Sequence, residues 1–146
     1  MIITDEKILR TPCEDVLPEE IGHLRDALEV ALKYSEEMGR PGIGIACPQI
    51  GIFKKFSIVR IPGSNGVIKL DLINPIIEVG YDLAPFEGEG CLSFPGVVKN
   101  TMRYSELVVK NQLVEPQRFI VKGLLFATCT AHEIEHLDGK LLIDKP

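Results

Sequence analysis

The four cysteines of this sequence form no C-x-x-C pair, because they stand at positions 13, 47, 91 and 129. This spacing excludes the usual zinc-ribbon and zinc-finger patterns and the thioredoxin-type redox motif. Two structural disulfides are not expected in a reducing compartment, so each cysteine has to be judged singly.

Long apolar stretches and basic runs are also missing. No apolar run approaches the roughly 20 residues that span a bilayer, and the N-terminus has no secretory hydrophobic region. The lysines and arginines are scattered, with no basic run beside aromatic residues. We therefore expect a cytoplasmic protein with no membrane segment and no direct binding of nucleic acid.

The composition itself is that of an ordinary globular protein, with 45% hydrophobic residues, 25% charged residues and a formal net charge of −5. The 146 residues contain no internal repeat and no long linker. A chain of this length buries roughly 70% of the surface that its unfolded form exposes. We expect one domain over residues 1–146, and a monomer.

Apolar periodicity predicts two helices with strands between them. Residues 18–38 are typical of a helix, because Pro18 suits its first turn and apolar residues recur at helical spacing. Residues 39–51, GRPGIGIACPQIG, then break the pattern with four glycines and two prolines. Strands are predicted at 53–60, 67–75, 76–80, 103–113 and 117–123, with a loop or short strand at 87–96. A second helix is predicted at 124–137, ending near Gly139. The fold class is α+β, with antiparallel strands packed around a late buried helix and with an N-terminal helix.

The late helix carries the sequence AHEIEHLDG, in which two histidines stand four residues apart. His132 and His136 therefore point the same way one turn apart, as two ligands of one metal ion would. Glu133 lies beside them, within reach of a water that such an ion would hold. This set predicts a metal site with an adjacent base.

A third ligand is not found downstream. Leu142 stands where a metzincin protease would have histidine, and only ten residues follow His136. Cys129 is seven residues from His136, about 10.5 Å along the helix axis, which is too far for shared coordination.

The upstream candidates are few. His23 is expected at the surface of the first helix, and Cys13 lies in a polar loop. Cys47 and Cys91 both occupy glycine-rich segments that can present a side chain at close range. The spacing alone leaves both of these cysteines open.

Three ordered stretches together resemble the peptide deformylase family. They are GIGIACPQIG (42–51), EGCLSFPG (89–96) and AHEIEHLDG (131–139). The opening EKILRTPCEDV also looks like the N-terminal segment of that family. The resemblance spans nearly the whole chain.

The resemblance implies that Cys91 is the third ligand and that the ion keeps one position open for water. It implies Glu133 as the general base, which takes a proton from the attacking water and passes it to the leaving amine. The Gln49 side-chain amide and the Leu92 backbone N–H would stabilise the oxyanion. The reaction implied is removal of the formyl group from N-formylmethionine at the start of nascent polypeptides at the ribosome, with release of formate.

Substrate contacts follow from the same resemblance. An extended peptide would pair with the backbone of Ile43, Gly44 and Gly90. The methionine side chain would enter an apolar pocket formed by Ile43, Leu125 and Cys129. The family implies Fe²⁺ as the ion, although a Cys/His/His set also accepts Zn²⁺, Ni²⁺ or Co²⁺.

Several residues depart from the family pattern. Cys47 replaces an alanine, Ala131 a glutamine and Glu135 an aspartate, and such changes near ligands predict an altered rate or metal preference. Arg103 matches a family arginine, and we expect it to pair with Glu89.

The sequence also lacks the extended last helix of many members. Short forms of this kind occur among phage, where the protein would work in the host cytoplasm.

Three alternatives remain at this point. A metallopeptidase would share the histidine helix but lacks its downstream ligand. A metal-stapled binding module would need a fourth protein ligand. A family member acting on another acyl-amide would keep every motif.

Overall fold

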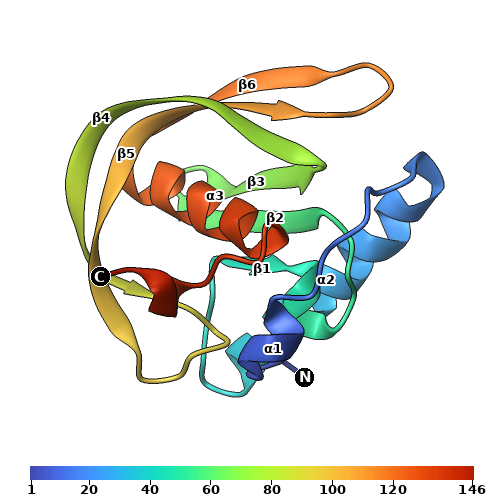
Figure 1. Cartoon of the computed structure of the whole chain (residues 1–146), viewed down its shortest axis with the longest axis horizontal. Coiled ribbons are helices and arrows are strands. Elements are labelled where there is room, and N and C mark those ends of the chain that lie inside the picture. The colour runs from blue at the N-terminus through green and yellow to red at the C-terminus, as the bar shows by residue number, and fades with distance from the viewer.

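The computed structural model describes residues 1–146 and has the predicted α+β architecture (Figure 1). Its α-helices are α1 (Glu6–Leu9), α2 (Ile21–Glu37) and α3 (Leu124–Leu137). Its strands are β1 (Gly44–Ala46), β2 (Phe56–Gly63), β3 (Gly66–Ile73), β4 (Pro75–Gly90), β5 (Val98–Asn111) and β6 (Gln117–Lys122). Short 3-10 helices occupy Pro18–Glu20, Cys47–Ile50 and Leu142–Asp144. None of the helices has the length and hydropathy needed to cross a membrane.

The strands form two antiparallel sheets, ordered β1-β2-β3 and β4-β5-β6. Figure 1 shows the long β4–β5 pair curving around α3, with α2 on the far side of the molecule from that arch. The chain after α3 turns back toward β4 and β5, so its end lies beside the arch.

Helix α3 is central because both sheets pack on it. One core joins its apolar side chains to those of β2, β3, β5 and β6, namely Val59, Ile61, Leu72, Leu107, Val109, Val121, Ala127, Ala131 and Ile134. Polar side chains on such a helix lose water and need protein partners or a bound ligand. The helix therefore buries His132, Glu133 and His136.

Helix α2 confirms the prediction for residues 18–38. Pro18 opens a 3-10 turn, and the α-helix follows from Ile21. Leu24 and Leu28 are buried in a second core that includes Phe56 and Ile58 of β2. This core holds the first sheet, including β1, against α2.

Strand β4 differs from the prediction of a strand at 76–80 and a separate loop or short strand at 87–96. Residues 75–90 form one continuous strand with register shifts at Ile77/Val79 and Phe86/Glu89, and residues 91–96 form the loop that follows it. Asp82 and Gly88 have left-handed backbones, with φ of 58° and 78°. Bulges of this kind bend a strand, and here they let β4 follow the surface of α3. The strand ends at Gly90 and delivers residue 91 to the α3 histidines.

Two short elements were not predicted. Helix α1 has a single turn, capped by the Asp5 carboxylate, which accepts from the N–H of Lys7 at 2.9 Å. Strand β1 lies within the glycine-rich segment and pairs Gly44 with Val59 of β2. Both are too short for an apolar periodicity to be visible.

Candidate metal centre and active-site cavity

Three potential ligands converge between α3 and the end of β4. The rings of His132 and His136 have centroids 5.0 Å apart, and Cys91 Sγ lies 3.3 Å from His136 Nε2. The ligand atoms of these three residues all lie within 4.8 Å of one another. One sulfur and two imidazole nitrogens at this separation can share a single ion.

The two histidines differ in protonation. Burial acts to lower the pKa of His132, but its contacts with Cys91 and Glu89 outweigh burial and raise this pKa to about 10. Burial lowers the pKa of His136 to about 3, so its imidazole is neutral. Its Nδ1 is buried and has no hydrogen-bond partner. His132 Nδ1 lies 2.8 Å from Glu89 Oε2, which fixes the tautomer and turns Nε2 toward Cys91. The residues therefore fit a thiolate/imidazole-bound divalent ion such as Zn²⁺ or Fe²⁺.

Glu89 is itself held by a buried network. Arg103 donates to it twice, Nε to Oε1 at 2.9 Å and Nη2 to Oε2 at 2.6 Å, which confirms the predicted pairing. Thr101 Oγ1 donates at 2.7 Å. Burial acts to raise the pKa of Glu89, but the hydrogen bonds from His132, Arg103 and Thr101 outweigh it and hold the pKa well below its usual range. The carboxylate is thus ionised and fixed.

Glu133 lies beside the ligands, tightly packed but without a hydrogen-bond partner for Oε1. Its side chain is buried. Burial raises the pKa of Glu133 to about 7, and the carboxylates of Glu89 and Glu135 add to the rise against the opposing effect of His132. Gly44 of β1 packs so closely that a Cβ there would lie 2.5 Å from Glu133 Oε2. The carboxyl can take and give a proton near neutral pH.

The loop that carries Cys91 is fixed from two sides. The Gln49 side chain accepts from the N–H of Ala46 at 2.9 Å and donates through Nε2 to Ser93 Oγ at 3.0 Å and toward Cys91 Sγ at 3.6 Å. Arg40 Nη2 donates to the Leu92 carbonyl at 2.9 Å. Gln49 is buried, so its contacts with Ser93 and Cys91 are shielded from water.

A cavity of about 530 Å³ opens over the centre. Its lining includes every residue for which the sequence predicted a substrate contact: Ile43, Gly44, Gly90, Leu125 and Cys129. The cavity brings these residues together with Gln49, Leu92 and Glu133. Their roles toward a substrate remain predictions.

Other residues also line the cavity. Phe86 lines the cavity, whereas its exposed neighbour Glu87 does not. Arg40 and Thr128 also line it, and no motif distinguishes them from ordinary surface or core residues.

The remaining cysteines and the third histidine stand apart from the metal centre. Cys47 is fully buried in the core between α2 and the first sheet, and burial raises its pKa to about 12. It is a packing residue, and it is not in the ligand cluster. His23 is exposed on α2, as predicted, and Cys13 lies in the N-terminal segment. The geometry thus favours Cys91 of the two cysteines that spacing alone left open.

A family model described as polypeptide deformylase matches residues 1–146. The chain belongs to the polypeptide deformylase family. Membership confirms the resemblance carried by the three motifs, and it makes the chain an enzyme of the metallohydrolase class.

Polypeptide deformylases from bacteria and phage are similar to it over most of their length. The peptide deformylase of Prochlorococcus marinus (strain AS9601) is 36% identical over 141 residues, which covers 90% of this chain and 69% of that protein. The crystal structure of a probable peptide deformylase from synechococcus phage S-SSM7 has a TM-score of 0.86 at 30% identity and covers 100% of this chain and 99% of its own. A Met-Ala-Ser-bound class I type b peptide deformylase from Acinetobacter baumannii has a TM-score of 0.82 at 26% identity, and the match covers 100% of this chain and 97% of that chain. The predicted fold is therefore the deformylase fold.

Proposed function

We propose that this chain removes the formyl group from N-formylmethionine at the start of newly made polypeptides and releases formate. The observation that carries the proposal is the buried Glu133, whose Oε1 has no partner, beside the Cys91/His132/His136 cluster and under a peptide-sized cavity. The relative from Acinetobacter baumannii holds the peptide Met-Ala-Ser, which supports a substrate that begins with methionine.

Cys91, His132 and His136 are proposed to hold the ion. A divalent ion bound there supplies Lewis-acid chemistry, because it polarises an amide carbonyl and makes an attacking water more acidic. Fe²⁺ is the ion proposed for the cell, with Zn²⁺, Ni²⁺ and Co²⁺ as substitutes that the same ligand set accepts.

Glu133 is proposed to move the proton. With its pKa raised to about 7 by burial, it can accept the proton of the attacking water and return it to the leaving amine of methionine. Gly44 leaves just enough room for the carboxylate, so β1 sets its position.

Gln49 and Leu92 are proposed to stabilise the developing oxyanion. The Gln49 amide lies 3.6 Å from Cys91 Sγ, so one of its hydrogens points to the ligand side, where the formyl oxygen would lie. The Leu92 N–H belongs to the peptide bond that follows Cys91, and Arg40 fixes the next carbonyl. Two donors of this kind act most strongly where water is excluded.

Substrate recognition is proposed to use backbone and apolar wall together. The peptide would lie along β1 at Ile43 and Gly44 and along the end of β4 at Gly90. Its methionine side chain would pack against Leu125 and Cys129. The enzyme is proposed to act as a monomer in the cytoplasm, on chains that emerge from the ribosome.

The test is release of formate from a formyl-Met tripeptide by protein loaded with Fe²⁺ without oxygen, or with Ni²⁺. The Glu133→Gln variant should bind the same amount of metal and lose activity about 10²- to 10⁴-fold, the range typical of a general base. The unformylated tripeptide should stay intact. Cleavage of that peptide, or full activity of the variant, would contradict the proposal.

A further inference from the structure

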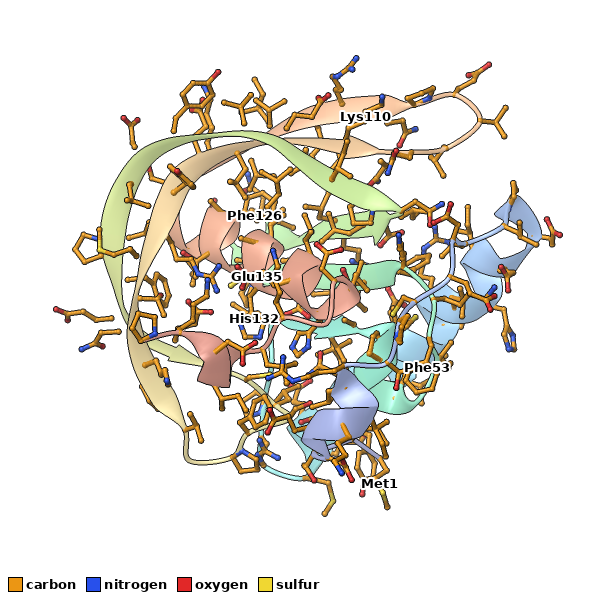
Figure 2. The ribbon with its side chains drawn as sticks, in the orientation of Figure 1. Met1, Phe53, Lys110, Phe126, His132 and Glu135 are labelled. Atoms are coloured by element: carbon orange, nitrogen blue, oxygen red, sulfur yellow. The ribbon has the colours of Figure 1, made fainter.

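The three candidate ligands are connected to the C-terminal segment by a row of alternating charged side chains. Glu135, next to His136 on α3, accepts from Arg103 Nη1 at 2.9 Å and Nη2 at 3.0 Å. Lys145 Nζ lies 3.0 Å from the same carboxylate. Figure 2 shows His132 and Glu135 on α3 within the arch of β4 and β5. The row therefore runs from His132 through Glu89, Arg103 and Glu135 to Lys145.

Arg103 is the shared member of this row. Its Nη2 carries two hydrogens and donates one to Glu89 Oε2 at 2.6 Å and the other to Glu135 Oε1 at 3.0 Å, so the two carboxylates share the charge of one guanidinium. The side chains of Arg103 and Glu89 are only 5% and 4% exposed, so water cannot replace a lost contact. With Lys145 present, two cations balance two carboxylates.

The position of Lys145 is set by the fold rather than by its own side chain. Leu141 and Leu142 are each 2% exposed, which docks the segment onto the molecule. Lys99 of β5 donates to the carbonyls of Ile143 and Lys145. The preceding residue, Asp144, forms a two-bond ion pair with Arg10, with Nη1 to Oδ2 at 3.0 Å and Nη2 to Oδ1 at 2.6 Å.

We propose that Lys145 and Glu135 are positioning residues for the metal ligand His132, acting through Arg103 and Glu89. The Lys145 ammonium group attracts Glu135 Oε2 and so weakens the attraction of Glu135 for the Arg103 guanidinium. Without that charge, Arg103 shifts toward Glu135, the Glu89 carboxylate loses part of its support, and the His132 ring is less firmly held. This inference rests on the proposed metal site.

The experiment measures release of Co²⁺ or Ni²⁺ from loaded protein into excess chelator. Removing a direct outer partner of a ligand typically costs 10- to 100-fold in metal affinity. Lys145 lies three contacts beyond Glu89, so Lys145→Met should speed release roughly three- to tenfold, scaled down from that range. Lys145→Arg should restore slow release. Lys140→Met is the matched control, because Lys140 is an exposed lysine of the same segment with no ion pair, and it should leave release unchanged.

A double-mutant comparison separates positioning from general stability. In a Glu135→Gln background, residue 135 is neutral and attracts Arg103 less. Adding Lys145→Met should then change the rate of metal release less than twofold, which measures the coupling between the two sites. A lower unfolding temperature for Lys145→Met with wild-type release in both backgrounds would overturn the inference. If wild-type protein bound metal and released formate while Lys145→Met behaved as wild type, only this inference would fail. If wild-type protein bound no metal, the proposed function would fail with it.

Discussion

Replacing Gly44 with alanine should disable the base without emptying the metal site. A Cβ at this position would lie 2.5 Å from Glu133 Oε2 and 2.9 Å from Cγ and Cδ, whereas ordinary contact begins at 3.4 Å. The carboxylate therefore has to move by about 0.9 Å, the difference between 3.4 and 2.5 Å. It cannot swing outward freely, because it is buried under β1.

A misplacement of about 1 Å in a catalytic group can cost about 10²-fold in rate. We therefore expect kcat for formate release to fall about 100-fold, equivalent to about 2.7 kcal/mol in the barrier. The metal content should stay at the wild-type value, because Glu133 is not a ligand in this account. Gly22→Ala is the matched control, since nothing lies within 4 Å of its added Cβ. Activity of Gly44→Ala within threefold of wild type would show that the position of Glu133 does not limit the reaction.

Four further changes test other parts of the structure. Stripping the ion with a chelator should abolish activity while far-UV circular dichroism persists, because the two apolar cores contain no ligand; unfolding on removal would point to a structural metal. The hydrogen bond from Arg10 lowers the pKa of Asp144 from 3.8 to about 2, so the stability from this pair is complete above about pH 4 and is lost as the pH falls toward 2. Thermal unfolding of wild type and Arg10→Met should therefore converge between those pH values; a constant difference would refute the assignment. Arg103→Met leaves buried carboxylates unpaired and should cost about 3–5 kcal/mol in urea unfolding, and a cost under 1 kcal/mol would show that the network is dispensable. Ile43→Asp should raise KM with kcat largely kept, and an unchanged KM would remove Ile43 from the pocket.

The helix with the two histidines was predictable from the sequence because its signal is local. His132, Glu133 and His136 lie within five consecutive residues, and helical geometry alone brings them to one face. The position of Cys91 was different. Both Cys91 and Cys47 lie in glycine-rich segments, so spacing favoured Cys91 only slightly and left both open until the resemblance, and then the structure, separated them. The pairing of Arg103 with Glu89 was reached by the same resemblance and is seen at 2.6 Å.

What could not be predicted depends on long-range geometry. Strand β4 was divided in two because Asp82 and Gly88 interrupt its pattern, and these two residues have the left-handed backbone of the bent strand. The link from Glu135 to Lys145 spans the turn after α3, and neither residue belongs to a periodic pattern that would indicate contact. Side chains such as Phe86 and Arg40 become cavity walls only when β4 and the segment before β1 meet.

We propose above all that Cys91, His132 and His136 hold the ion over which the reaction occurs. X-ray absorption at the metal edge of Zn²⁺-loaded protein measures this directly. We expect one sulfur at about 2.3 Å and two imidazole nitrogens at about 2.0–2.1 Å, and loss of the sulfur signal in Cys91→Ser. A first shell without sulfur in the wild-type protein, or one unchanged by Cys91→Ser, would contradict it.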